Sequence, residues 1–333
     1  MATTRVPTPT ASAFVKGVAA GIKSRTTEYA RQHERSPILL SPGDVIGNYD
    51  ASRLLMTTIG GSPHPITQAD LRAFALNAKA IGSRFRGGIT PQGVIDHSRP
   101  ADRKRARAQI HYAVPARNKS GLIQFVTNAG PDSRASRHFV TVELGNFGAA
   151  VATPRTAGQM ADYLTRGKVK IECDCPHWRY TYRFIATVGK YNATVAEWGF
   201  PKEKNPELSG VACKHVLRVM VALREGQVRH YIAKMIERAR GSVAPKTAST
   251  TAGEARTIIQ AQTETRSPIS ASAKKTAASK SAARLRAVAR RAIESAQAKQ
   301  TTTTARARNG VQNLLHLGAI TQKQADRLLA KIK

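Results

Sequence analysis

The chain is short of cysteine, of aromatic residues and of long apolar runs, and each shortage excludes something. Its 333 residues include three cysteines, and an odd number without a signal peptide argues against a disulfide framework. Aromatic residues make up 5% of the chain, so we expect one modest core with long, poorly ordered flanks. No apolar run reaches the roughly 18 residues that a membrane-spanning helix needs, so none is expected.

The N-terminal segment lacks the uninterrupted apolar core and the cleavage site of a secretory signal peptide. Lys16 interrupts its apolar stretch, which runs from Ala11 to Ile22. We therefore do not expect secretion through a signal peptide. The expected location is the reducing cytoplasm.

Acidic residues are scarce as well. The chain has 21 Asp and Glu against 53 Lys and Arg, which gives a formal net charge of +32. Such an excess is self-repelling in a compact chain, so it predicts a polyanionic partner. The expected partner is nucleic acid, DNA before RNA, bound with weak sequence specificity and mainly through its phosphates. An acidic membrane surface is the rarer alternative and is not expected here. Copies of the same chain are a further partner that the sequence allows.

Enzyme signatures are also missing. The sequence contains no phosphate-binding loop, no His-Glu-x-x-His, no Gly-x-Ser-x-Gly and no dinucleotide fingerprint. Its few carboxylates form no evident two-metal cluster. We therefore expect a protein that is not an enzyme, and we predict no catalytic residue.

All three cysteines that are present fall into one pattern with a histidine. The pattern reads Cys-x-Cys, a long gap, then Cys-x-His, and its members are Cys173, Cys175, Cys213 and His215. Three thiolates and one imidazole are the ligand set of a closed tetrahedral zinc site. A disulfide between Cys173 and Cys175 would close a tight, strained ring. Because four protein ligands leave no open position for a catalytic water, the predicted zinc is structural.

Two alternatives to this ligand set remain open. The cysteines can be free thiols buried in a core, where cysteine is common, beside a histidine on the surface. His177 lies two residues after Cys175 and is a possible substitute ligand.

The β-branched and aromatic runs predict a small β-structure around these ligands. Residues 122–127 and 138–144 are strand-like, and Gly, Pro, Asn and Asp between them predict a hairpin with a long loop. Residues 168–173 alternate between apolar and charged side chains, which indicates a half-buried strand that ends at the first ligands. An apolar stripe then predicts helix over 211–238, with a break near Gly226.

The remaining chain divides by composition and by helix signals. Thr67 and Asp70 form a variant capping box, and Pro91 and Pro100 are placed at early helical positions. Thr321 with Gln324 marks a further helix start. The predicted fold class is α+β, with five segments: a basic N-terminal arm (1–34), a helical region (35–120), a small β-rich zinc domain (121–238), a basic low-complexity linker (239–310) and a short helical hairpin (311–333).

Two groups of basic residues are candidates for contacts with nucleic acid. Arg103, Lys104, Arg105 and Arg107 cluster after Pro100, and they form either a solvated helix face or a phosphate-contacting patch.

The second group lies in residues 178–184, which alternate aromatic with polar or basic side chains. As a strand, this segment places Arg179 and Arg183 opposite the aromatic rings. The rings then either form the core of the zinc domain or stack on bases.

The pattern Cys173-Asp-Cys175 … Cys213-Lys-His215 resembles SWIM-type zinc fingers, which occur in helicase-associated proteins and transposases. The resemblance implies a ββα-like unit that binds DNA or protein and is not itself catalytic. It covers only residues 173–215, and the stretch 176–212 is longer than in most members of the family.

The wider arrangement of hairpin, Cys-x-Cys and Cys-x-His is similar to SWIM-containing structural proteins of tailed bacteriophages. We therefore predict a zinc-binding protein that binds nucleic acid, as a DNA-associated structural protein of a virion. One alternative is an assembly protein whose finger docks on other proteins. The other is a DNA-processing component of the transposase or nuclease type.

Overall fold

A computed structural model describes residues 38–44, 55–242, 247–272, 304–305, 307–315 and 321–331. The predicted N-terminal arm, residues 1–34, lies outside the described residues. Within them, no helix is long and apolar enough to cross a membrane.

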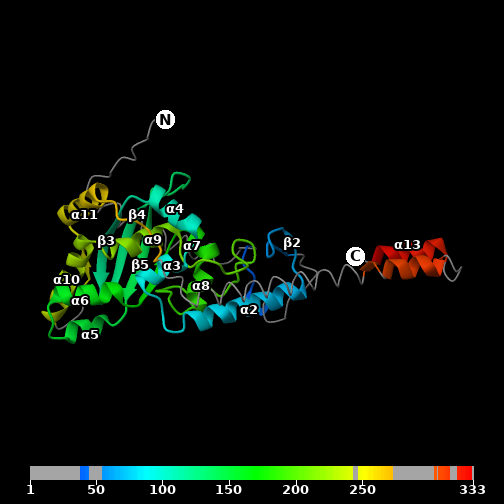
Figure 1. Ribbon diagram of the computed structural model, residues 1–333, viewed down its shortest axis with the longest axis horizontal. Helices are drawn as coiled ribbons and strands as arrows, with labels where there is room; N and C mark the ends of the chain where they lie inside the picture. The colour runs from blue at the N-terminus through cyan, green and yellow to red at the C-terminus, as the bar shows by residue number, and fades with distance from the viewer. Residues whose placement is uncertain are drawn as a thin grey trace.

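Helices and an open antiparallel sheet form the described part of the chain, which confirms the α+β class (Figure 1). The main sheet has the strand order β6-β5-β4-β3-β7. Its strands are β3 (Ala113–Lys119), β4 (Leu122–Asn128), β5 (Arg137–Leu144), β6 (Val169–Cys173) and β7 (Ala248–Ser249). A separate two-stranded sheet pairs β1 (Met56–Thr57) with β2 (His64–Pro65).

The predicted hairpin and the predicted strand before the ligands are both confirmed. β4 and β5 pair from Leu122 opposite Glu143 to Asn128 opposite Arg137. β6 adds to β5, with Cys173 opposite Val140. This register places the first predicted ligand at the end of an edge strand, next to the middle of its neighbour.

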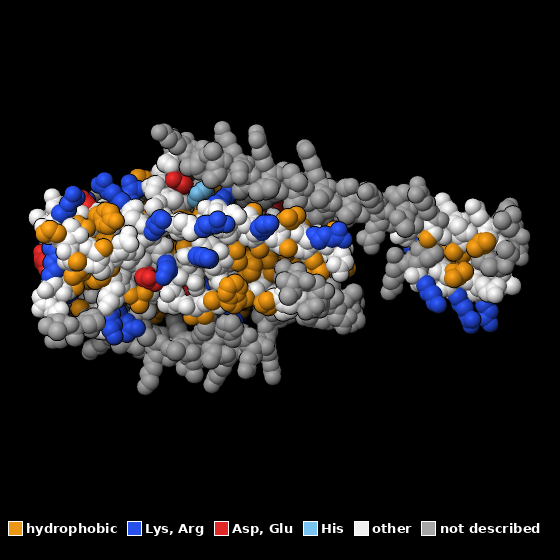
Figure 2. Space-filling model, turned by 90° about the horizontal axis from the view of Figure 1, so that it is seen from below, with side chains coloured by type: hydrophobic (Ala, Val, Ile, Leu, Met, Phe, Trp, Pro, Cys, Tyr) orange, Lys and Arg blue, Asp and Glu red, His pale blue; other side chains and the backbone are white. Residues whose placement is uncertain are grey.

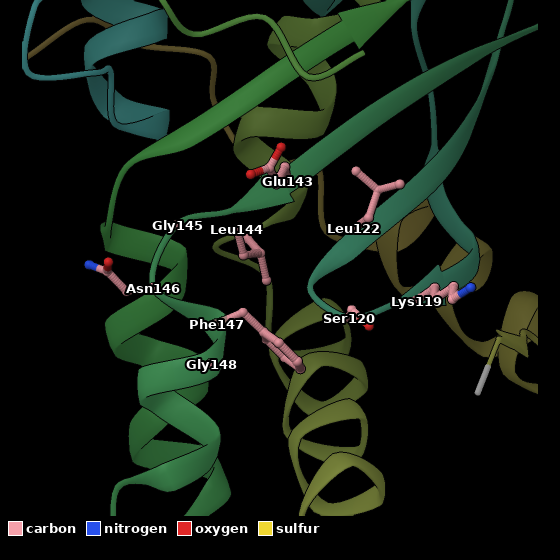
Figure 3. Close-up of a pocket in the computed structure, with 9 residues that line it drawn as sticks. All are labelled: Lys119, Ser120, Leu122, Glu143, Leu144, Gly145, Asn146, Phe147 and Gly148. Carbon is pink, nitrogen blue, oxygen red and sulfur yellow. The ribbon is translucent and has the colours of Figure 1, made fainter. Parts of the chain in front are cut away.

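A tight turn joins β3 to β4. Ser120 and Gly121 both have positive φ, 49° and 84°, as the favoured two-residue hairpin turn requires. A side chain at Gly121 would meet Phe147 at 2.6 Å, so glycine is also needed there for space. The hollow beside this turn is lined by β3–β4 residues and by the 143–148 connection, and it contains none of the predicted site residues (Figure 3).

Helices cover the sheet and extend away from it, and the starts predicted from sequence are present. Thr67 and Asp70 form the capping box of α2, Thr90 caps α3, and Pro100 is the first residue of α4. Thr321 donates to Gln324 Oε1 through both its N–H and its hydroxyl, at 2.9 Å each, where α13 begins. The helices are α2 (Gln68–Arg84), α3 (Pro91–His97), α4 (Pro100–Gln109), α5 (Phe147–Ala152), α6 (Ala157–Arg166), α7 (Pro176–Thr181), α8 (Arg183–Val188), α9 (Lys214–Ala222), α10 (Gly226–Arg240), α11 (Ala252–Glu264) and α13 (Gln322–Lys331).

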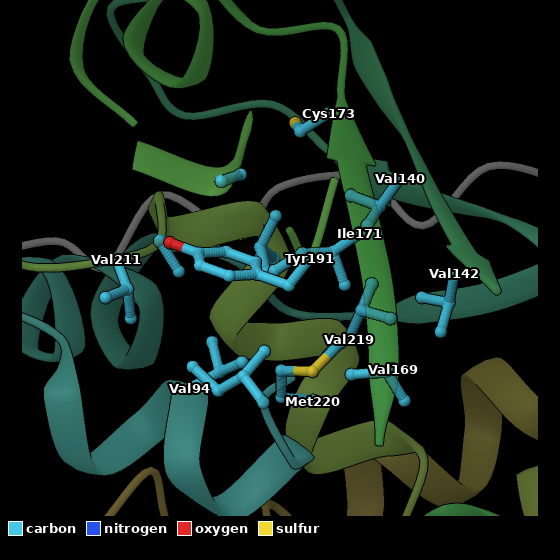
Figure 4. Packing of buried hydrophobic residues seen from close by; sticks show 14 of the residues in the cluster. Val94, Val140, Val142, Val169, Ile171, Cys173, Tyr191, Val211, Val219 and Met220 are labelled. Atoms are coloured by element: carbon cyan, nitrogen blue, oxygen red, sulfur yellow. The ribbon is translucent and has the colours of Figure 1, made fainter. Parts of the chain in front are cut away.

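The sheet has a different core on each face. On one face, side chains of β4, β5 and β6 pack with those of α9, and Figure 4 shows Val169 and Ile171 of β6 beside Val219 and Met220 of α9. On the other face, α11 packs on the sheet. The core there consists of Tyr112, Val114, Ala116, Val126, Phe139, Ala255, Ile258 and Ile259.

Three regular elements lie where the sequence predicted other structure. β3 falls inside residues 35–120, which we predicted to be helical, and its Ala113 and Val114 are fully buried. β7 and α11 fall inside the predicted basic linker, residues 239–310. The folded part of the chain therefore extends further on both sides than the predicted β-rich segment at 121–238. α11 is ordered because Thr251 and Glu254 form a capping box and its two isoleucines are buried against the sheet.

The prediction of a strand at 178–184 is wrong. The segment is divided between α7 and α8, because Cys175 caps a helix whose first residue is Pro176. Trp178 and Tyr182 are four residues apart, so they lie on one side of a helical turn, and both are fully buried. These rings belong to the main core, which agrees with the packing interpretation and not with base stacking.

Candidate metal centre

The four predicted ligands come from three elements that the fold brings together. Cys173 ends β6, and Cys175 is the N-cap residue of α7. Cys213 is the N-cap residue of α9, and His215 lies in the first turn of that helix. All four side chains are buried. The centre therefore joins an edge strand of the sheet to the helix that packs across the same face.

The ligand atoms of these residues lie within 4.8 Å of one another. His215 Nδ1 is 4.0 Å from the sulfur of Cys173 and 4.0 Å from that of Cys213. A tetrahedral zinc with sulfur at about 2.3 Å places its ligand atoms roughly 3.8 Å apart. A shift of about 1 Å or less would bring every pair to that spacing. The group is thus a Cys3His cluster that fits a metal ion.

Electrostatics favour a cation at this position. Burial raises the pKa values of the Cys173 and Cys175 thiols well above the ordinary range. Burial also opposes ionisation of Cys213, but its contacts with the other two thiols and with His215 lower the pKa of Cys213 well below normal. Three thiolates in so small a volume would repel one another without a positive charge between them. A bound cation reverses this, because a coordinating thiol is deprotonated outright.

Backbone groups support the sulfur atoms as acceptors. The Trp178 N–H donates to Cys175 Sγ at 3.2 Å. The α9 N-terminus carries partial positive charge next to Cys213, and its cap has no side-chain hydrogen bond. Both features stabilise negative charge on sulfur.

A chain of polar side chains lies beside the cluster. The His138 ring is 4.3 Å from the His215 ring, centroid to centroid. His138 Nδ1 lies 2.9 Å from Asp174 Oδ1, and its Nε2 lies 3.4 Å from Ser133 Oγ. Asp174 stands between the first two ligands in sequence, so this chain ties the 129–136 loop to the ligand-bearing turn. The spacing of the cysteines gave no signal for His138, because its partner is distant in sequence.

The second group of predicted nucleic-acid contacts is not exposed. Arg183 is 2% exposed, and its Nε donates to Glu172 Oε1 at 2.8 Å. Arg183 Nη2 also donates to the Cys173 carbonyl at 3.3 Å. Arg179 is buried too. Arg183 therefore supports the ligand-bearing turn from inside, and neither buried side chain is placed to contact a phosphate. The alternation of aromatic and basic residues at 178–184 suggested a strand. The segment is helical, and a helix can bury residues that lie three or four positions apart.

The first group divides between structure and solvent. Arg103 donates to the Ile95 carbonyl at 3.2 Å and to the Ser98 carbonyl, so it caps the end of α3. Arg105 pairs with the fully buried Asp102 and remains 46% exposed. Lys104 and Arg107 are exposed.

His177, the predicted substitute ligand, is not among the four clustered residues. Its Nδ1 lies 3.8 Å from Asp102 Oδ1, and its ring packs against that of Tyr182. Burial lowers the pKa of His177. Its position supports the contact between α7 and α4.

No family model matches the chain, and the searches of curated proteins and of solved structures also found no match.

Proposed function

We propose that Cys173, Cys175, Cys213 and His215 hold a structural zinc ion, and that the protein binds nucleic acid mainly through phosphate contacts. The observation that carries the metal part is the convergence of all three cysteines and one histidine into a single buried cluster. Zinc is the ion whose tetrahedral preference and borderline softness fit three sulfurs and one nitrogen. Four protein ligands leave it to stabilise the fold.

The nucleic-acid part rests on charge. The chain carries a net charge of +32, and Figure 2 shows Lys and Arg side chains spread along one face with few acidic side chains among them. A surface of this kind attracts a polyanion by neutralisation of phosphates and release of counterions. Such binding is weakly sequence-specific and falls steeply as salt rises.

The pattern of the ligands suggests a SWIM-like centre. In favour of this proposal, β4 and β5 form a hairpin, β6 supplies the Cys-x-Cys turn, and α9 begins at the Cys-x-His pair. Here the unit is part of a larger sheet that includes β3 and β7. By the weaker resemblance to phage proteins, we propose a DNA-associated structural role in a virion.

Metal analysis of matched histidine variants tests the zinc centre. We expect His215→Ala to lose zinc, and His177→Ala to retain one equivalent, since only His215 lies in the cluster. Elemental analysis of purified protein gives the stoichiometry. If His215→Ala retained a full equivalent of zinc and His177→Ala lost it, the fourth ligand would be His177 and not His215.

A salt titration tests nucleic-acid binding. The affinity for a DNA duplex should fall by orders of magnitude between about 50 and 200 mM salt if several phosphates are contacted. An affinity that does not change over this range would rule out binding through phosphates.

Protein docking is a second candidate function, favoured by exposed apolar side chains on two helical stretches, residues 307–315 and α13. Leu314 and Leu328 are 44% and 40% exposed. If these leucines dock on a second copy or on a virion protein, Leu314→Gln with Leu328→Gln should lower the association measured by analytical ultracentrifugation. A DNA-processing role, the third hypothesis, requires cleavage of DNA in the presence of Mg²⁺ or Mn²⁺.

A further inference from the structure

Five basic side chains from three parts of the chain gather around α4. Lys104, Arg105 and Arg107 lie on α4 itself, Lys214 is the first residue of α9, and Arg266 follows α11. We refer to these five residues as the α4 surface.

Hydrogen bonds between side chains and backbone show that the three parts meet. Lys214 Nζ donates to Gln109 Oε1 at 2.7 Å, which ties the start of α9 to the end of α4. Arg266 Nη2 donates to the Arg107 carbonyl and lies 3.2 Å from His111 Nδ1. The α4 surface is therefore built by tertiary structure, and the sequence cluster at 103–107 supplies only part of it.

Arg266 and His111 are close enough to affect each other. Burial and the Arg266 guanidinium lower the pKa of His111. Of the acidic groups nearby, Asp102 is fully buried and holds Arg105, and Asp132 lies near Lys214. Positive charge therefore exceeds negative charge here, and an anion would relieve the repulsion.

The metal centre fixes one member of the surface. Lys214 stands between Cys213 and His215 in sequence, so its backbone is held by two of the four candidate ligands. α4 is held against the same region by the Asp102–Tyr182 hydrogen bond. These two attachments limit how far the cations can move apart.

Exposed aromatic rings are absent from this surface. Among the described residues, the large apolar side chains that are exposed are Met56, Leu76, Leu122, Tyr163, Trp198, Leu314 and Leu328. None belongs to α4, to α9 or to the segment after α11. Proteins that hold unpaired bases use aromatic rings as stacking platforms. A surface with cations and no rings fits the sugar-phosphate backbone of a duplex instead.

We propose that the α4 surface is where the protein contacts the phosphates of double-stranded nucleic acid. The inference rests on the proposed function, and it adds the place of contact and the form of the nucleic acid.

Charge removal at matched positions tests the place of contact. The test variant is Lys104→Gln, Arg107→Gln and Lys214→Gln, which leaves the ion pair between Arg105 and the buried Asp102 intact. The control is Arg72→Gln, Lys79→Gln and Lys119→Gln, which removes the same charge from exposed positions outside the α4 surface. Thermal melting of both variants and their zinc content establish that each is folded.

We expect the test variant to bind a short DNA duplex roughly tenfold or more weakly than wild type at about 0.1 M salt. Its salt slope should fall by about one unit for each phosphate contact that is lost. The control should stay within about twofold. If the two variants lost the same affinity for the duplex, the α4 surface would not be the place of contact, although the protein would still bind phosphates.

Two further outcomes separate the remaining claims. A wild-type protein that binds neither duplex nor single strand would refute the proposed function and this inference together. The wild-type protein could instead bind a single strand of the same length more tightly than the duplex, and the test variant could lose that affinity. This result would support the α4 surface as the place of contact but refute the preference for double-stranded nucleic acid. A folded test variant with wild-type affinity would refute the place of contact.

Discussion

The two faces of the main sheet are covered in different ways. On one face, α9 is joined to β6 by the Cys3His cluster as well as by a large apolar core. On the other, α11 is held by a small apolar core and by a few polar contacts. The first face depends on side chains with special chemistry, and the second depends on ordinary packing.

The two faces should therefore respond differently when contacts are removed. A bound metal would contribute a few strong bonds that are lost together, so its removal would act on the whole face at once. A small apolar core loses stability in steps, one side chain at a time.

Removal of the metal should have the largest effect. Structural zinc contributes about 10–16 kcal/mol of apparent binding free energy in small domains, similar to the whole stability of a typical domain. We expect Cys213→Ser, or chelation of the wild-type protein, to unfold the region around β6, α7 and α9. Circular dichroism melts with and without chelator measure this. An unchanged melting temperature in protein shown to be metal-free would contradict it.

Loss of an apolar contact on the α11 face should cost less. Ile258→Ala removes a buried side chain that is 4% exposed, and such truncations cost about 2–5 kcal/mol. Arg256→Ala, at an exposed position on the same helix, is the matched control and should change stability by less than about 0.5 kcal/mol. Urea unfolding gives both values. Equal effects of the two substitutions would mean that α11 does not pack on the sheet.

A polar contact on the same face should have a smaller effect. Gln262 is buried, accepts from the Ala113 N–H at 2.8 Å and donates to the Ala113 carbonyl at 3.0 Å. Gln262→Leu leaves these buried backbone groups unpaired, at a cost of about 1–3 kcal/mol. The exposed Gln260→Leu serves as the control in the same urea unfolding experiment. Faster hydrogen exchange of the Ala113 amide in Gln262→Leu would identify the lost contact, and an unchanged rate would contradict it.

The helix cap should matter least. Thr251→Ala removes the hydroxyl that accepts from the Glu254 N–H at 3.3 Å, and such caps contribute about 0.5–2 kcal/mol. Thr251→Ser keeps the hydroxyl and should retain wild-type stability. If serine and alanine have the same effect, the cap does not stabilise α11.

Sequence reasoning found the elements that carry a local signature. The capping residues at Thr67, Thr90 and Thr321 marked helix starts, and the strand-like runs marked β4, β5 and β6. The spacing of Cys173, Cys175, Cys213 and His215 predicted a cluster that the structure brings together. These signals are local or chemically specific, so they do not depend on knowledge of distant contacts.

Elements that depend on distant contacts were missed. β3 begins shortly after α4 ends, and its apolar residues are buried because β4 pairs with it and because the cores on both faces of the sheet include its side chains. α11 lies among alanine, threonine and serine residues of a kind typical of linkers. The helix is held on the sheet by the burial of Ile258 and Ile259. The burial of Arg183 depends on Glu172, which no spacing rule connects to it.

The order of the elements along the chain has a consequence for synthesis. All four candidate ligands precede β7 and α11 in the chain. During synthesis, the face of the sheet on which α9 packs can therefore form before α11, which covers the opposite face, has been made. Until α11 arrives, Val114, Val126 and Phe139 lack the cover that Ala255, Ile258 and Ile259 supply. A nascent or truncated chain ending near residue 242 would therefore contain the whole Cys3His cluster but expose an apolar strip, and would tend to associate through it.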